Sequence, residues 1–200
     1  MTERESATVA ALRSALDGMG ELVAGVRPEQ WASASNCPEW DVRALVQHVV
    51  YGNRYYTAVL SGQGQPDRGR VSGLPDQDEL GDDPSAAWRD SAAGLLSAFG
   101  APGVLEQTFP SALGPTPGAG LADLRLTETL VHGWDLARST GQSPAFDDAV
   151  AQTALDFTTR SLPPGTERSS FPFAPEQPVA ADAPAIDRLA AHLGRSVAAG

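Results

Sequence analysis

Three residues of the types that bind metal ions occur where helices could bring them together. Glu128 and His132 are four positions apart in a segment whose apolar residues have helical spacing, so both side chains leave the same face of the helix. His48 lies far upstream, in a second segment of helical spacing. Two imidazoles and one carboxylate can hold one divalent ion and leave coordination positions open, as metal-dependent chemistry requires.

The residues alone also allow a simpler interpretation. A Glu-x-x-x-His pair is a common ion pair within a helix, and a single inward histidine is usually a hydrogen-bonded residue of the core. In combination they favour a metal more strongly, because the core of a helical bundle rarely contains two histidines and a carboxylate without a partner that satisfies them. The predicted ligands are therefore His48, Glu128 and His132, with zinc, nickel and non-haem iron all compatible with this set.

The segments that must position these residues are predicted to be helices. Apolar residues recur every three or four positions over 9–23, so a first helix should end before Pro28. Asp41 is the predicted N-cap of a second helix over 42–60, whose inward stripe includes His48. Further helices are predicted at 84–99, 121–139 and 147–161, with a breaker-rich loop at 61–83, an irregular or weakly extended piece at 104–120, a proline-rich stretch at 163–184 and a short docking helix containing Ile186, Leu189 and Leu193.

Four long amphipathic helices joined by breaker-rich loops predict an all-α antiparallel four-helix bundle with additional C-terminal helices. A length of 200 residues with 42% hydrophobic content is consistent with one domain over residues 1–200. Bundles of this kind place metal sites among inward side chains of facing helices, so the fold suits the predicted ligands.

Composition excludes several classes of function. The net charge of -11 argues against a nucleic-acid partner, because nucleic-acid binders display a basic face. The chain has no lysine, which excludes a P-loop lysine and a lysine Schiff base. Cys37 is the only cysteine, so no intramolecular disulfide can form. Without a signal peptide or an apolar run long enough to cross a bilayer, a cytoplasmic protein with no membrane partner is expected.

The motif Trp-Asp-Val-Arg-Ala-Leu-Val-Gln-His over 40–48 and the motif Glu-x-x-x-His-Gly-Trp-Asp over 128–135 resemble actinobacterial metal-binding proteins related to mycothiol-dependent maleylpyruvate isomerase, within the DinB-like superfamily. The resemblance extends over almost the whole chain, including the closing segment 187–195. It implies a DinB-like bundle, a metal held by His48, Glu128 and His132, with zinc the expected ion, and mycothiol or another small thiol as cosubstrate.

An enzyme of this kind would be an isomerase or S-transferase that acts on a small electrophile. Two departures limit what the resemblance implies. The isomerase has a further C-terminal domain, whereas this chain is expected to end with a proline-rich tail and a short helix. Before Trp40, the Pro-Thr-Pro-Cys of many relatives is absent and only Cys37 is kept. A metal-binding bundle without catalysis and an interaction module without metal are the alternative functions, and assembly as a homodimer is left open.

Several other residues have two interpretations. Cys37 is either a reactive thiol or a packing residue beside Trp40. His192 is either a fourth ligand or a peripheral packing or surface residue. Asp135 either orients an imidazole or forms an ordinary ion pair with Arg138 or Arg43. The four tryptophans of the chain, Trp31, Trp40, Trp88 and Trp134, are expected to fill the core.

Overall fold

The computed structural model describes residues 3–38, 40–64, 77–111, 114–144, 146–168 and 173–197. Parts of the predicted loop at 61–83 and of the proline-rich stretch at 163–184 lie outside the described residues. The helices are α1 (Glu3–Ala24), the short 3-10 helix η1 (Pro28–Gln30), α2 (Val42–Leu60), α3 (Pro84–Phe99), α4 (Gly118–Thr140), α5 (Asp148–Ser161) and α6 (Ala185–His192), and the strands are β1 (Thr108–Ser111) and β2 (Gly114–Pro117).

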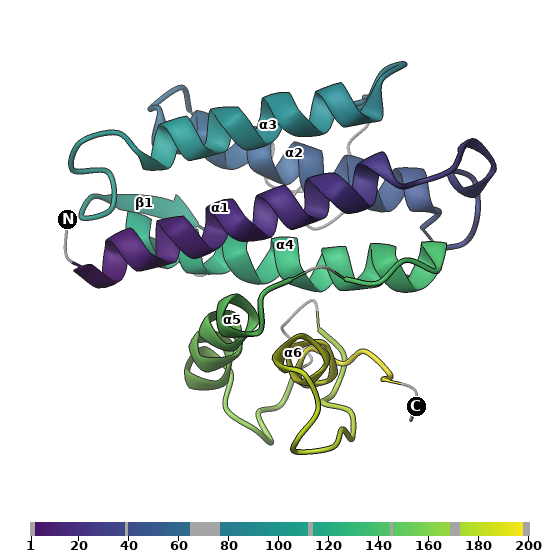
Figure 1. The fold of residues 1–200 in the computed structure, drawn as a ribbon. Coiled ribbons are helices and arrows are strands. Elements are labelled where there is room, and N and C mark those ends of the chain that lie inside the picture. Colours follow the sequence, from purple (N-terminus) through teal and green to yellow (C-terminus); the bar gives the residue numbers. More distant parts are fainter. Residues whose placement is uncertain are drawn as a thin grey trace.

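The four long helices α1 to α4 form a bundle in which each helix packs against two neighbours (Figure 1). Helix α1 contacts α3 and α4, and α2 contacts the same two helices. The predicted all-α bundle is confirmed, and the contacts also define the helix directions. Helices α1 and α4 run in one direction and α2 and α3 in the other (Figure 1).

Individual contacts support these directions. Asn53 of α2 donates to Ser91 of α3 over 3.2 Å and accepts from Arg125 of α4 over 2.8 Å. Farther along, Gly94 of α3 faces Thr57 of α2, so residue numbers rise together along α2 and α3. A long crossover between consecutive helices permits this parallel pair. Helices α2 and α4 are antiparallel, which places the early turns of α2 beside the late turns of α4.

Local chemistry explains several helix ends. The side chains of Asp41 and Asp83 accept hydrogen bonds from the backbone N–H groups of Ala44 and Ala86, at 2.7 and 2.9 Å, as expected for N-caps. Helix α4 ends at Gly141, whose φ of 69° is in the left-handed region that glycine adopts without strain.

The start of α4 differs from the sequence-based prediction. The helix begins at Gly118 rather than at Leu121, after a β1–β2 hairpin that was predicted only as an irregular or weakly extended piece. The N–H of Gly118 donates to the carbonyl of Gln107 over 2.8 Å, so the chain before the hairpin caps the helix from outside. A Cβ at Gly118 would lie 2.1 Å from the carbonyl oxygen of Val104, which explains the glycine.

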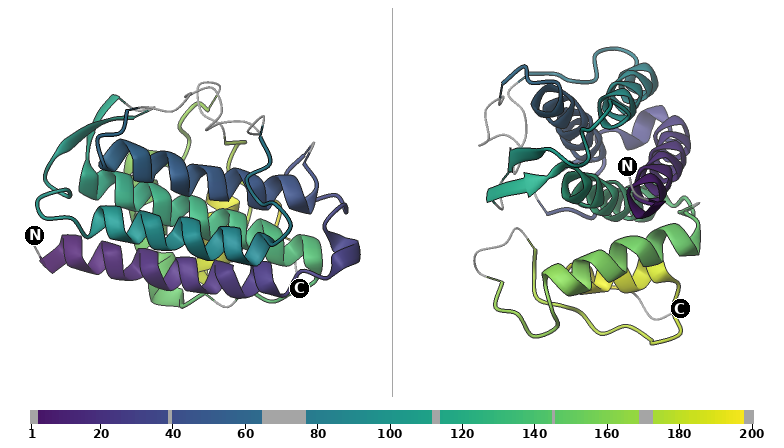
Figure 2. Two further views of the ribbon diagram at one scale, coloured as in Figure 1. Left: turned by 90° about the horizontal axis from the view of Figure 1, so that it is seen from above. Right: turned by 90° about the vertical axis from the view of Figure 1, so that its left-hand side faces the viewer.

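Helices α5 and α6 pack against each other and lie across the outside of the bundle, next to α4 (Figure 2). Fully buried residues of α6 include Leu189 and Ala190, and the helix contacts both α4 and α5. The indole Nε1 of Trp134 on α4 donates to Asp187 on α6 over 2.7 Å. Within the described part of the chain, every helix is too short or too polar to cross a bilayer.

Candidate metal centre

The structure brings the three predicted metal ligands together between α2 and α4. One ligand atom from each of His48, Glu128 and His132 lies within 4.8 Å of those of the other two. Oε2 of Glu128 is 3.4 Å from Nε2 of His132 and 3.8 Å from Nε2 of His48. Both histidines are buried, as predicted for an inward stripe, while the Glu128 side chain retains 28% exposure. The group is therefore accessible from one side.

The distances suit a metal ion. Zinc bonds of about 2.0–2.2 Å in a tetrahedral site separate neighbouring ligand atoms by roughly 3.3–3.6 Å. The two separations from Oε2 of Glu128, 3.4 and 3.8 Å, are close to that range. In the described ranges, no fourth histidine, cysteine or acidic residue joins this group. The donor set thus fits an ion with at least one coordination position left for another ligand.

The segment before α2 covers one side of this group. The ring of Trp40 is 4.7 Å from the ring of His48 and 6.3 Å from that of His132, centroid to centroid. The backbone N–H of Asn36 donates to Ser139 on α4 over 2.8 Å. This contact fixes the covering segment to the helix that carries two of the three candidate ligands.

Asp135 lies on the other side of the His132 ring. Its Oδ2 is 3.2 Å from Nδ1 of His132, so Nδ1 carries a proton and the Nε2 atom is left to face Glu128. The predicted role of Asp135 in orienting an imidazole thus agrees with the geometry, but its predicted ion-pair partners are wrong. Arg195 binds Asp135 instead.

Arg43 and Arg138, the predicted ion-pair partners of Asp135, have other partners. Arg43 donates to Asp78 over 2.9 Å, and the guanidinium of Arg138 is 5.4 Å from the centroid of the Trp134 ring. Sequence reasoning also missed Asn36, whose Nδ2 donates to Asp135 over 3.0 Å. Arg195 is 60 residues from Asp135 in the chain, so no local pattern signals the pair.

Charge in this cluster is strongly coupled. Burial alone would lower the pKa of His132, but hydrogen bonds with Asp135, Cys37 and Glu128 raise it well above its ordinary value. Burial alone would raise the pKa of Glu128, but hydrogen bonds from His132 and His48 hold it well below its ordinary value. Without a metal, these hydrogen bonds favour the protonated form of His132 between the two carboxylates, so a metal ion would compete with a proton for Nε2.

This charge arrangement predicts a pH dependence of the metal-free protein. Because the folded-state pKa of His132 is raised, its stabilising contribution is complete below the unfolded pKa of about 6.5 and is lost as the pH rises through the folded pKa. Glu128 has the opposite sign, and its contribution is lost as the pH falls through its lowered folded pKa. His132→Gln should flatten the decline on the alkaline side in urea unfolding with a chelator present. An unchanged decline would assign it to another group.

The structure also locates Cys37, His192 and the four tryptophans. Cys37 is half-buried, and its thiol donates to Oδ2 of Asp135 over 3.2 Å. His192 is a buried residue outside the cluster, with Nδ1 3.3 Å from Glu176, so the packing interpretation is correct and the surface one is wrong. Trp88 and Trp134 are buried in the core as predicted, whereas Trp31 and Trp40 are only partly buried.

The interface between α2 and α4 also contains a buried arginine that sequence reasoning overlooked. Arg125 is 2% exposed and is one turn before Glu128. Its guanidinium lies over the Tyr56 ring at 5.4 Å, and a Cβ at Gly52 would come within 2.7 Å of its Nη1. Burial lowers the pKa of Arg125, and the negative charge of Glu128 partly offsets that effect. The glycine therefore makes room for a cation beside the candidate ligands.

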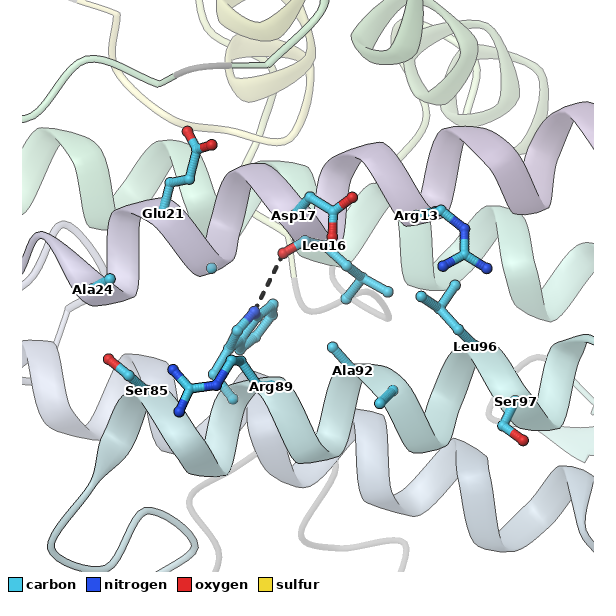
Figure 3. A pocket seen from close by; sticks show the side chains of 13 residues that line it. Arg13, Leu16, Asp17, Glu21, Ala24, Ser85, Arg89, Ala92, Leu96 and Ser97 are labelled. Atoms are coloured by element: carbon cyan, nitrogen blue, oxygen red, sulfur yellow. Dashed lines mark hydrogen bonds between the residues drawn. The ribbon is translucent and has the colours of Figure 1, made fainter.

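A hollow of about 700 Å³ lies elsewhere, between α1 and α3 (Figure 3). Its walls combine apolar residues such as Leu16 and Leu96 with charged ones such as Asp17 and Arg89. None of the candidate ligands lines it. The indole of Trp88 donates to the carbonyl of Leu16 over 3.2 Å and closes one part of this space.

The four packed helices and the inward group of two histidines and one carboxylate define a helical-bundle protein with a candidate metal centre. Residues 12–137 match the model of the mycothiol maleylpyruvate isomerase N-terminal domain family, and the chain belongs to that family. This range contains His48, Glu128 and His132 but not Arg195.

The chain is also similar to a full-length relative and, in its fold, to solved structures. The chain is 35% identical over 191 residues to an uncharacterised protein found in two strains of Mycobacterium tuberculosis, covering 94% of this chain and 97% of the relative. The fold of this chain is similar to the crystal structure of the mycothiol-dependent maleylpyruvate isomerase, with a TM-score of 0.59. The match covers 76% of this chain and 70% of the isomerase chain, at 15% sequence identity. A histidine-to-alanine variant of that isomerase gives a TM-score of 0.60 with 14% identity and the same coverage.

Proposed function

We propose that this protein binds one divalent metal ion through His48, Glu128 and His132 and uses a small thiol to act on a small electrophile. The observation that carries the proposal is the convergence of three metal-binding side chains from two helices within 4.8 Å, in a chain that belongs to the mycothiol maleylpyruvate isomerase N-terminal domain family. Zinc is the proposed ion, and nickel and iron suit the same ligand types. Mycothiol is the proposed thiol.

The chain's own residues would prepare the site for such an ion. Asp135 holds Nδ1 of His132 at 3.2 Å and thereby directs the Nε2 lone pair toward the ion, as outer carboxylates do for histidine ligands. Trp40, with its ring against His48, limits water on that side. A divalent ion held there would supply Lewis acidity that stabilises a thiolate at neutral pH.

A thiolate at this site can support either of two reactions. In an isomerisation, the sulfur would add to a conjugated double bond, the resulting single bond would rotate, and loss of the same thiol would restore the double bond in the other geometry. In a transfer, the reaction would stop at the adduct. Both use a nucleophilic thiol and a small electrophile, and the choice of substrate decides between them.

A metal that only joins α2 and α4 is the second candidate function. A structural zinc site usually has four protein ligands. His192, the third histidine of the sequence, was the candidate for the fourth ligand. Its imidazole is instead paired with Glu176, outside the cluster. That observation favours an open site over a purely structural one. A cytoplasmic location and a homodimer stay predictions.

Cobalt substitution tests the thiol part of the proposal. Adding mycothiol to the cobalt-loaded protein should produce intense near-ultraviolet thiolate-to-cobalt charge-transfer absorption, because the three-residue ligand set leaves a position for sulfur. The measurement is an absorption titration at constant cobalt occupancy. S-methylated mycothiol is the matched control, since it cannot form a thiolate, and it should leave the spectrum unchanged. If saturating mycothiol and saturating cysteine both leave the spectrum unaltered, the site is closed to thiols and the enzymatic proposal fails.

A further inference from the structure

The carboxylate of Asp135, next to His132, contacts four other side chains. It is fully buried and is contacted by residues from three separate parts of the chain. Asn36 and Cys37 reach it from the segment before α2, His132 from one turn earlier in α4, and Arg195 from the residues that follow α6. The C-terminal segment therefore contacts the metal centre through one carboxylate.

Arg195 holds both oxygens of this carboxylate. Its Nη2 donates to Oδ2 of Asp135 over 2.9 Å and its Nε donates to Oδ1 over 3.3 Å. Two parallel hydrogen bonds from a planar guanidinium fix the plane of a carboxylate as well as its position. Because Oδ2 also contacts Nδ1 of His132, fixing that plane restricts the orientation of the imidazole ring.

Among the hydrogen bonds of the described residues, the guanidinium of Arg195 contacts only Asp135 and the backbone of Leu193, so any effect on His132 passes through Asp135. Its Nη1 donates to the carbonyl of Leu193 over 3.1 Å, so all three guanidinium nitrogens are engaged. Its side chain is 16% exposed, and its charge together with the hydrogen bonds to Asp135 offsets the cost of burying that anion. A negative charge kept in this place can orient His132 without competing for the metal ligands.

We propose that Arg195 is a positioning residue of the metal centre, which holds Asp135 so that His132 presents its Nε2 to Glu128 and His48. This inference rests on the proposed metal site and extends it to residues outside the matched family range. Because coupling between binding events is reciprocal, docking of α6 strengthens metal binding and metal binding strengthens docking of α6. The C-terminal helices thus regulate how well the bundle holds its ion.

Metal affinity of the full-length chain, measured by competition with a chromophoric chelator, tests the proposal. Arg195→Met keeps the aliphatic stem and removes the guanidinium, and it should weaken zinc binding about 10-fold or more, in the range known for outer-shell partners of metal ligands. Arg195→Lys restores the charge without the planar fork and should fall between Arg195→Met and the unmodified protein.

The matched control is Arg188→Met. Arg188 lies on α6, close in the chain to Arg195, and donates to Gln152 and to the carbonyl of Ala183. This change therefore removes a guanidinium from the same C-terminal region without touching Asp135. Its zinc affinity should stay within about twofold of the unmodified protein. The visible spectrum of the cobalt form should change in Arg195→Met and not in Arg188→Met, because a purely structural loss does not alter ligand geometry.

Hydrogen exchange of the unmodified protein provides a measurement that needs no variant to fold. Zinc should slow exchange of the α6 amides, and exchange unaffected by zinc would contradict the coupling. If the unmodified protein binds zinc but Arg195→Met matches it in affinity and cobalt spectrum, the role of Arg195 is wrong while the metal site stands. If the unmodified protein binds no divalent metal, the proposed function fails, and the inference fails with it.

Discussion

Alanine in place of His48 or of His132 is expected to abolish tight metal binding while leaving the bundle folded. Each change removes one of three ligand atoms that lie within 4.8 Å of one another, so the loss should exceed the roughly 10–100-fold typical of an outer-shell partner. Metal content after purification without a histidine tag, read by elemental analysis, should drop from about one equivalent to near zero. Far-ultraviolet circular dichroism should remain helical.

His192→Ala is the matched control for these two variants. This histidine is buried like His48 and His132 but is paired with Glu176 over 3.3 Å and lies outside the cluster. Its alanine variant should keep the metal. Full metal content in both His48→Ala and His132→Ala would rule out this ligand set. Unfolding of the protein on addition of a chelator would instead favour a purely structural metal that joins α2 and α4. The free energy of metal binding would then be part of the free energy of folding.

Helix positions could be predicted because their determinants are local. Asp41 forms the expected N-cap, Asp83 caps the next helix in the same way, and Gly141 ends α4. The start of α4 was misplaced because its cap is not local: the carbonyl of Gln107, across the β1–β2 hairpin, accepts from Gly118. The parallel packing of α2 with α3, and of α1 with α4, was not anticipated either, because apolar periodicity identifies a helix but not its direction in the bundle.

The candidate site divides in the same way. His48 faces inward on α2, and Glu128 and His132 share a face of α4, so periodicity allowed the three to meet inside the bundle, and the resemblance favoured them as ligands over a helix ion pair and a buried histidine. The partner of Asp135 was not predictable, because helical spacing offers Arg138 and chain proximity to His48 suggests Arg43. Only tertiary packing reveals that Asp78 and the Trp134 ring engage those arginines, which leaves Asp135 to Arg195.

Trp134→Ala is expected to cost about 3–5 kcal/mol in the free energy of unfolding, the range for truncating a large aromatic residue in a core. Trp134 is 1% exposed, and its indole N–H donates to Asp187 of α6 over 2.7 Å. The residue therefore joins the bundle to the C-terminal helices, although it lies between His132 and Asp135 in the sequence. Urea unfolding of the metal-free protein measures the loss without a contribution from metal binding.

Two further variants separate the parts of this effect. Trp134→Phe keeps most of the ring but loses the hydrogen bond to the Asp187 carboxylate, and bonds to charged groups contribute about 1.5–3 kcal/mol. Trp31→Ala, at a partly buried tryptophan packed at the edge of the core, should cost less than Trp134→Ala because less apolar surface is lost. Equal losses for the two alanine variants would contradict the role of Trp134 in holding α6. The tryptophan of the His-Gly-Trp-Asp motif would then contribute no more to the free energy of unfolding than an aromatic residue at the edge of the core.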